Sequence, residues 1–178
     1  MTDREQQMAE IIHTSKIKIY QDKRPVRRAY MKISQNRFGS ACMAASSIST
    51  KLNRRKNLPA TLDYMIAAVG GWLTGTLGGV LEARGIPNYP DKLHSEVEGD
   101  IENKDGVIVI SRIRVEYFIK IPKGKKAAAE RALTLHPDRC PAAVSVRNSI
   151  EISYSAEILQ EWKISQTAWS FRIKKLSF

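Results

Sequence analysis

A single uncharged stretch constrains this chain more than any other part of its sequence. From Tyr64 to Leu81 there is no Asp, Glu, Lys or Arg, although 26% of all residues are charged. Such a run must be kept from water, either in a protein core or in a bilayer. Pro59 suits the first turn of a helix, and Gly85 is typical of a helix end. The sequence therefore predicts one long helix over 59–86.

Five glycines lie inside this predicted helix, and each costs up to about 1 kcal/mol of helix stability relative to alanine. Gly71, Gly75 and Gly79 recur every four residues, so they share one helix face and let another backbone approach closely. In a bilayer this spacing would be a dimerisation motif, but the run is at the short end of what spans a membrane. We predict a buried helix that packs against the same helix of a second copy, and no membrane partner.

The net charge of +11 is concentrated in the two ends of the chain. Residues 1–57 contain 13 Lys and Arg against 4 Asp and Glu, residues 58–158 are nearly neutral, and residues 159–178 are again basic. Basic flanks can bind phosphate backbones or an anionic surface. However, the sequence has no zinc-finger spacing and no aromatic RNA-binding motif. A solvated surface is the simpler interpretation, and we expect no nucleic-acid partner.

Length and cysteine content describe an ordinary globular protein. The 178 residues are enough for one domain with a sizeable core. The first ten residues are polar and lack the apolar run of a secretory signal, which predicts a cytoplasmic protein. Two cysteines, Cys42 and Cys140, do not make a disulfide framework.

Alternating apolar residues predict strands on both sides of the long helix. The clearest strand runs from Val107 to Ile121, after an Asn-Lys-Asp-Gly turn that predicts an antiparallel hairpin with one buried face. This order of strands, long helix, hairpin, helix and strand predicts an α+β fold. The remaining predicted elements are strands at 11–19, 29–33, 40–52, 93–101 and 149–156, a helix at 124–135, a short helix beginning at Pro141, and a final strand in the tail.

Cys140 is the most suggestive single residue for chemistry. It directly precedes Pro141, at the predicted start of a helix, where the helix dipole and the neighbouring Arg139 would stabilise a thiolate. The alternative is a buried, unreactive cysteine, since free cysteine is among the most buried residue types. His136 and Asp138 together with Cys140 are only a weak pattern for metal binding, and we predict no metal site and no cofactor.

The long helix, the strand after it and the Cys-Pro turn together resemble the OsmC/Ohr family (osmotically inducible protein C and organic hydroperoxide resistance proteins). The family helix typically reads LLLAALGGCLTMTL, and this chain has YMIAAVGGWLTGTL. The family's Cys-Pro turn and following strand are matched by RCPAAVSVRNSIEISYS, and the connection ARGIP…SEVEGDI is also similar. The resemblance covers roughly residues 16–158. It is good from Pro59 onward and poor before it.

This resemblance implies an intertwined homodimer of α+β subunits, with antiparallel sheets around the long central helices. It implies one domain over 1–158, of which 1–57 is the poorly matched basic part, and a C-terminal extension over 159–178. Family members reduce hydroperoxides with two cysteines. One cysteine, on the central helix, attacks the peroxide, and the second, at the Cys-Pro turn, resolves the resulting sulfenic acid. An arginine and a glutamate support the reactive thiolate, and a small dithiol restores the enzyme.

The chain departs from the family at the position of the attacking cysteine, which holds Trp72. Indole does not form a sulfenic acid, so the oxidation sequence has no first step there. The family glutamate falls on Leu62, with Asp63 one position away, or about 100° around a helix. Arg37 is the candidate for the family arginine. Cys140 carries over as the resolving-type cysteine.

Three functional hypotheses follow. In the first, the protein is an OsmC-like dimer without two-cysteine peroxidase activity, in which Trp72 lines the old pocket and binds an apolar or hydroperoxide ligand. In the second, Cys42 and Cys140 form a rearranged thiol peroxidase, provided that they approach within disulfide reach. In the third, the basic flanks bind nucleic acid or an acidic partner.

Overall fold

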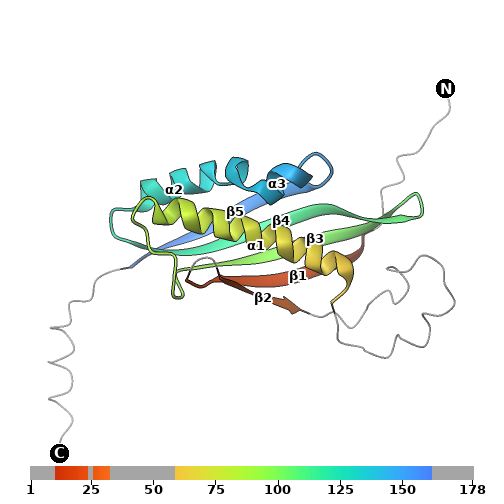
Figure 1. Cartoon of the computed structure of the whole chain (residues 1–178), viewed down its shortest axis with the longest axis horizontal. Coiled ribbons are helices and arrows are strands. Elements are labelled where there is room, and N and C mark those ends of the chain that lie inside the picture. Colours follow the sequence, from red (N-terminus) through yellow and green to blue (C-terminus); the bar gives the residue numbers. More distant parts are fainter. Residues whose placement is uncertain (1–10, 24–25, 33–58, 162–178) are drawn as a thin grey trace, which may run out of the picture.

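The computed structural model describes residues 11–23, 26–32 and 59–161. In this part of the chain one β-sheet carries helices on a single face, giving a two-layer α+β arrangement (Figure 1). The long helix α1 runs along that face, and α2 and α3 lie beside it. The predicted fold class is therefore confirmed. The elements, in order, are β1 (Ile11–Gln21), β2 (Arg27–Lys32), α1 (Thr61–Glu82), β3 (Leu93–Lys104), β4 (Val107–Pro122), α2 (Lys126–Leu135), η2 (Pro137–Arg139), α3 (Pro141–Val146) and β5 (Glu151–Glu161).

The described strands form one five-stranded sheet in the order β2-β1-β3-β4-β5. The first three neighbouring pairs are antiparallel, whereas β4 and β5 are parallel. The prediction of antiparallel sheets around the helix is wrong in this respect. The chain between β4 and β5 passes through α2 and α3 on the helical face and returns to the end where β4 began. A crossover of this kind places the next strand parallel to the first.

Helix α1 begins and ends close to where the sequence predicts. Near its start, the Ala60 N–H donates to the Asp63 carboxylate over 2.7 Å, which satisfies one of the free amide groups of the first turn. At its end, Gly85 adopts a positive φ of 65°. This conformation favours glycine, and it lets the Ile86 N–H donate back to the Leu81 carbonyl over 3.0 Å.

The helix lies close to the sheet because small residues stand at the contact. A β-carbon at Gly70 would lie 2.6 Å from the Val97 side chain of β3, and one at Gly99 would lie 2.4 Å from the Ile66 side chain of α1. Neither position has room for a larger residue. Beside them, the Thr74 and Ser95 hydroxyl groups share a buried hydrogen bond of 2.6 Å. Gly70 of α1 therefore faces the sheet, and Gly99 of β3 faces the helix.

The β3–β4 hairpin confirms the predicted turn and corrects the predicted alternation. Asp105 and Gly106 both have positive φ values, as a tight hairpin turn requires. The pairing register shifts between Asp100 and Ile101, where an irregularity interrupts the ladder. Because of this shift, Ile110 is buried and Val107 is exposed, whereas the sequence pattern placed Val107 and Val109 with the buried residues. From Ile113 to Ile121 the prediction is confirmed.

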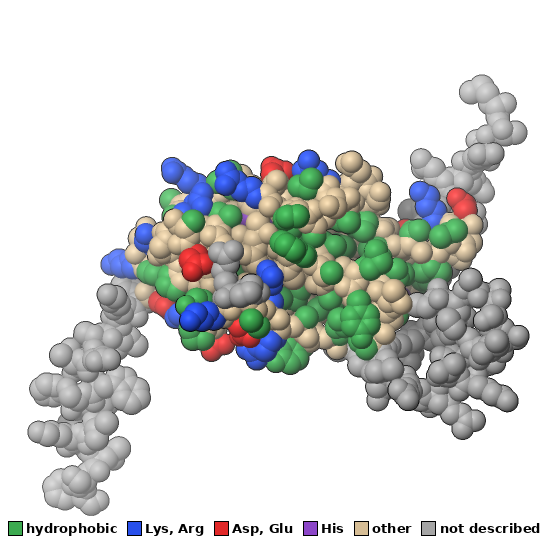
Figure 2. Space-filling view, in the orientation of Figure 1, with side chains coloured by type: hydrophobic (Ala, Val, Ile, Leu, Met, Phe, Trp, Pro, Cys, Tyr) green, Lys and Arg blue, Asp and Glu red, His purple; other side chains and the backbone are tan. Residues whose placement is uncertain are grey.

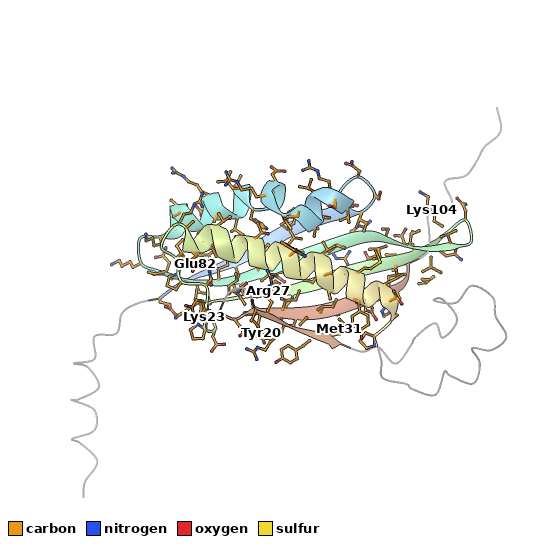
Figure 3. The ribbon with its side chains drawn as sticks, in the orientation of Figure 1. Tyr20, Lys23, Arg27, Met31, Glu82 and Lys104 are labelled. Carbon is orange, nitrogen blue, oxygen red and sulfur yellow. The ribbon has the colours of Figure 1, made fainter. Side chains whose placement is uncertain are left out.

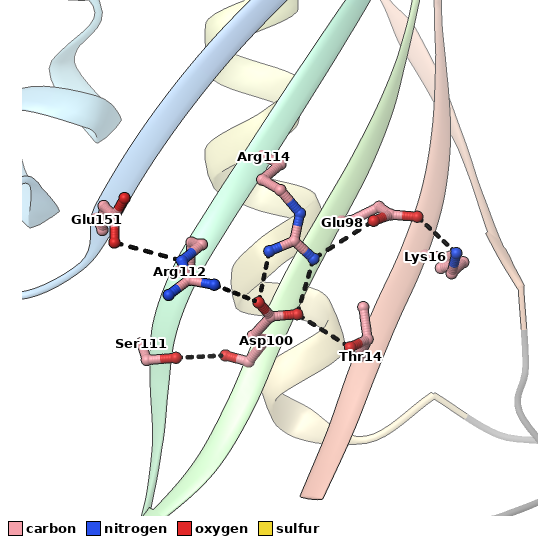
Figure 4. A network of polar contacts seen from close by, with 8 residues as sticks. All are labelled: Thr14, Lys16, Glu98, Asp100, Ser111, Arg112, Arg114 and Glu151. Carbon is pink, nitrogen blue, oxygen red and sulfur yellow. Dashed lines mark hydrogen bonds and ion pairs between the residues drawn. The ribbon is translucent and has the colours of Figure 1, made fainter. Parts of the chain in front are cut away.

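The sheet face away from the helices is covered by charged rows that run across the strands. Asp100, which is almost fully buried, accepts hydrogen bonds from Arg114 and from the Thr14 hydroxyl, and it also pairs with Arg112 (Figure 4). Glu98 completes the row between Lys16 and Arg114. These cross-strand pairs satisfy most of the charges on this face.

A row of rings continues this face toward the other end of the strands. The Tyr20 ring stacks on His94, and His94 stacks on Phe118, with ring centroids 5.3 Å and 4.7 Å apart. At one end of the row the Tyr30 ring packs edge-on against Tyr20, with ring centroids 5.8 Å apart. This packing stabilises the open sheet face and gives His94, a lone histidine in the sequence, a structural role.

By length and composition alone, helix α1 is also long and apolar enough to cross a membrane. Half of its most apolar stretch is buried inside the protein. Its core-facing side chains pack on the sheet, as expected of the central helix of a globular domain. The predicted strand at 40–52 and the predicted strand in the tail after residue 161 lie outside the described residues. The predicted basic part, residues 1–57, is described only over 11–23 and 26–32, which contain β1 and β2.

Candidate functional site

The face of α1 that points away from the sheet carries a row of exposed apolar side chains. Tyr64, Met65 and Trp72 are 55%, 49% and 50% exposed, and Ala68 lies between them on the same face. Figure 2 shows hydrophobic side chains gathered over this helix. We call Tyr64, Met65, Ala68 and Trp72 the α1 patch. A contiguous apolar row of this kind on a folded protein is typical of a binding surface.

Arg27 lies against the α1 patch from the neighbouring strand β2. Its guanidinium carbon is 5.9 Å from the centre of the Trp72 ring, within the range of a cation–π contact. Figure 3 shows Arg27 between β2 and α1. The side chain is half-buried, and among the described residues no carboxylate pairs with it. Sequence reasoning missed Arg27, because nothing in the QDKRPVRR segment shows which arginine faces the helix.

The position of Arg27 explains why residue 75 is a glycine. A β-carbon at Gly75 would lie 1.4 Å from a terminal nitrogen of Arg27, so any side chain there would displace the guanidinium. By contrast, nothing lies within 4 Å of a β-carbon at Gly71. The prediction that Gly71, Gly75 and Gly79 pack against another helix in the dimer is not tested by a single chain and stays a prediction. Within the protomer, Gly75 accommodates an arginine of β2.

Trp72 and Cys140 occupy different environments. We expected Trp72 to be largely buried beside Cys140, and the structure corrects this for the single chain, because half of Trp72 is exposed. Cys140 has no exposed surface and belongs to the hydrophobic core. The neighbouring helix residue Leu73 points into the core, so Trp72, about 100° away on the helix, points outward.

Cys140 lies in a buried group with two residues that could exchange a proton. The Tyr117 hydroxyl and His136 Nε2 are 2.8 Å apart, and His136 Nδ1 is 2.8 Å from the Leu133 carbonyl oxygen. A carbonyl can only accept, so Nδ1 carries the proton and Tyr117 donates to Nε2. Tyr154 packs edge-on against the same imidazole, with ring centroids 5.6 Å apart.

Burial keeps His136 and Tyr117 neutral. Loss of water lowers the pKa of His136, and burial, followed by the nearby Tyr154 and Cys140, raises the pKa of Tyr117 well above its usual value. Both shifts favour the uncharged form. The arrangement is a satisfied buried hydrogen-bond chain. It gives His136 a structural role, and within the described residues no group of three or more His, Cys, Asp and Glu could hold a metal ion.

We predict that Cys140 is a slowly reacting thiol. Because its side chain has no exposed surface, an alkylating reagent can reach it only after local opening. In a Cys42→Ser background, iodoacetamide at pH 8 should modify Cys140 at least about 100-fold more slowly than the same protein in urea. Mass spectrometry of timed samples measures both rates. Comparable rates in the native and unfolded protein would show that the thiol is open to solvent.

The other predicted site residues are placed only in part. Asp63 is buried, caps the start of α1 and lies 3.8 Å from His13 Nε2 of β1. These contacts give it a structural role, and nothing places it near Trp72 on the opposite helix face. Arg37 and Cys42 lie outside the described residues.

A hollow of about 500 Å³ lies on the open sheet face, opposite the α1 patch. Lysines and glutamates line it, and they pair with one another: Lys16 lies 2.6 Å from Glu98, and Lys18 lies 2.9 Å from Glu96. Because the charges that line this hollow already neutralise one another, they would bind a charged ligand only weakly. The α1 patch, with Arg27, is the better candidate site.

The family model that matches this chain is OsmC-like protein, over residues 55–155. The chain belongs to the OsmC-like protein family. The match begins just before α1 and ends within β5, so it contains Trp72 and Cys140 and leaves out Arg27. A search of curated proteins finds no match.

Several solved structures match this chain at low sequence identity. A hypothetical protein from Aquifex aeolicus is 18% identical, with a TM-score of 0.50, over 60% of this chain and 78% of that one. An OsmC-like protein from Mycoplasma pneumoniae is 16% identical, with a TM-score of 0.48, over 56% and 72%. The organic hydroperoxide resistance protein OhrB of Bacillus subtilis is 15% identical, with a TM-score of 0.40, over 64% and 79%.

Proposed function

We propose that this OsmC-like protein has lost the two-cysteine peroxidase chemistry and binds an apolar ligand on the α1 patch. The observation that carries the proposal is the indole of Trp72, exposed on the central helix where the sequence motif of the family has its attacking cysteine. The protein would then bind small apolar molecules as a member of a family that detoxifies hydroperoxides. We place the protein in the cytoplasm.

Chemistry supports the loss of peroxidase activity. Reduction of a hydroperoxide needs a thiolate that attacks the outer oxygen and becomes a sulfenic acid, and then a second thiol that forms a disulfide. Trp72 cannot perform the first step. Cys140, the resolving-type cysteine, is enclosed in the core beside Tyr117 and His136, where a bulky organic hydroperoxide has no access.

We also propose that the α1 patch is the homodimer interface, so that the ligand lies between the two copies. Its exposed apolar side chains lie on the family's central helix, and burying them would stabilise a complex by about 25 cal/mol for each Å² of apolar surface. We propose that two copies pack through this face, with Gly71 allowing close approach because its surroundings are open. Sedimentation equilibrium of the full chain tests this, and a monomer at micromolar concentration would contradict it.

The hydroperoxide assay tests the loss of activity. With cumene hydroperoxide and a dithiol, we expect no turnover above that of a Cys140→Ser variant. Turnover that exceeds this control would restore an enzyme function. If a Cys42→Ser variant then lost the activity, the hypothesis of a thiol peroxidase that uses Cys42 and Cys140 would replace this proposal.

A further inference from the structure

We infer that the free edge of β5 is an interaction surface for the chain's own C-terminal segment, which folds back and pairs with β5 as an antiparallel strand over residues 168–174. The inference goes beyond the proposed function and does not depend on the α1 patch. It begins from β5, the last strand in the order β2-β1-β3-β4-β5, which pairs with β4 alone among the described strands. Figure 1 shows β5 on the side of the sheet that carries α2 and α3.

The first step concerns the exposed edge of β5. This strand is 11 residues long, and its side chains are exposed except for Ile152 and Ile158, which are half-buried. An edge strand of this length presents a row of backbone N–H and C=O groups to which another strand can bind. The opposite edge strand, β2, is 6 residues long and begins with two arginines, and both features discourage such pairing. β5 contains no lysine, arginine or proline, so its edge lacks these protections.

The second step identifies the segment that covers this edge. Residues 162–178 lie outside the described residues and follow directly from the end of β5 at Glu161. From Trp169 to Lys174 the sequence reads WSFRIK, in which apolar and polar residues alternate as they do in a half-buried strand. A short connection between two strands places them side by side and antiparallel. The segment is therefore expected beside β5.

Charge also favours this pairing. β5 carries three glutamates and no basic residue, whereas residues 162–178 contain four Lys and Arg and no Asp or Glu. Two of the glutamates, Glu151 and Glu161, pair with cations of the described chain. Glu157 has no cationic partner among the described residues. An acidic edge strand with an unpaired carboxylate favours a basic strand beside it, because opposite charges on neighbouring strands attract.

The two faces of β5 differ in chemistry. Tyr154 packs against the buried His136 and therefore faces the helices, whereas Glu151 belongs to the charged network of the open sheet face (Figure 4). Because side chains alternate along a strand, Ile158 lies on the helical side and Glu157 on the open side. A strand that fits beside β5 should present apolar side chains to the helical side and cations to the open side.

A loop over residues 164–167 gives the register that matches these faces. Hairpin loops of four residues are common, and this one places Leu159 opposite Arg172 and Glu157 opposite Lys174. The apolar residues of WSFRIK then lie on the helical side, and its two cations lie beside the glutamates. A loop that is one residue longer or shorter would exchange the two faces and place the apolar residues among the glutamates. The inference therefore commits to the first register.

Disulfide scanning of the full chain tests both the strand and its register. In a Cys42→Ser background, Leu159→Cys is combined with one cysteine at each of the positions 170–174. Disulfide formation in a glutathione redox buffer is followed by mass spectrometry of timed, alkylated samples. Leu159 is 50% exposed, so its replacement leaves the core intact, and Cys140 is enclosed in the core and stays in place.

We expect the fastest disulfide within one chain between Leu159→Cys and Arg172→Cys. It should form at least about tenfold faster than with Phe171→Cys or Ile173→Cys, because cysteines whose side chains point to opposite faces cannot be bridged without movement of the backbone. The rate should therefore rise and fall with a period of two residues. The Leu159→Cys single variant is the control for disulfides between two copies.

Three results would overturn the inference. Equal rates at all five positions would mean that no strand pairs with β5. A maximum at position 171 or 173 would mean that the faces are exchanged. A disulfide between two copies of the Leu159→Cys single variant that forms faster than any disulfide within the chain would assign the edge of β5 to a second copy. None of these results bears on the proposed function, which the hydroperoxide assay and sedimentation test separately.

Discussion

Replacing Gly99 by valine should destabilise the protein by about 3 kcal/mol, the upper end of what overpacking a core costs. A β-carbon at Gly99 would lie 2.4 Å, 2.7 Å and 3.0 Å from three carbons of the side chain of Ile66, a fully buried residue of α1. All three contacts are too short, so a rotation of the end of Ile66 cannot relieve them. The helix would have to move away from β3, with loss of its packing on the sheet.

A double-mutant cycle shows whether Ile66 is the cause. Ile66→Ala alone should cost about 2–5 kcal/mol, because it leaves a cavity in the core. In the double variant, the valine side chain enters the space that Ile66 leaves. The double variant should therefore lose less stability than the sum of the two single losses, by about 1–3 kcal/mol. Urea unfolding followed by circular dichroism measures all four proteins. Additive losses would mean that Gly99 and Ile66 do not meet.

Asp100→Asn should cost about 2 kcal/mol at neutral pH and nothing at strongly acidic pH. The Asp100 side chain is 2% exposed and accepts hydrogen bonds from Arg114 and Thr14, with Arg112 as a further charge (Figure 4). Removing one partner of a fully buried ion pair costs about 3–5 kcal/mol. The loss here should be smaller, since Arg114 is 36% exposed and can regain water.

The pH dependence follows from the direction of the pKa shift. Hydrogen bonds from Arg114, which outweigh the opposing effect of burial, hold the pKa of Asp100 below its ordinary value. The ionised form is thus stabilised by folding. Its contribution is complete above the unfolded pKa of about 3.9 and is lost as the pH falls through the lower folded pKa.

A neighbouring change provides the control for Asp100→Asn. Glu151→Gln alters a carboxylate of the same network whose side chain is 68% exposed, so it should change stability by less than about 0.5 kcal/mol. Urea unfolding at pH 7, 5, 3 and 2 measures the wild type and the two variants. A wild-type advantage over Asp100→Asn that stays constant down to pH 2 would contradict the ionic explanation.

Much of the fold was predictable from residue patterns. The uncharged run ending before Gly85 predicted α1, because only a buried helix tolerates that length without charge. The Asp105–Gly106 turn predicted the β3–β4 hairpin, and the family motifs around Trp72 and Cys140 predicted the family that the 55–155 match confirms. These features depend on local backbone preference and short-range spacing, which a sequence contains in full.

Contacts between distant segments were decided only by the tertiary structure. The spacing of Gly75 showed that something approaches the helix closely, but not that it is Arg27, which lies 48 positions earlier in the chain. The same holds for Trp72, whose outward direction depends on which helix face meets the sheet. It also holds for the parallel placement of β5, which the crossover through α2 and α3 imposes. A one-dimensional pattern shows that a surface is apolar or smooth, whereas the identity of its neighbour depends on how the whole chain closes on itself.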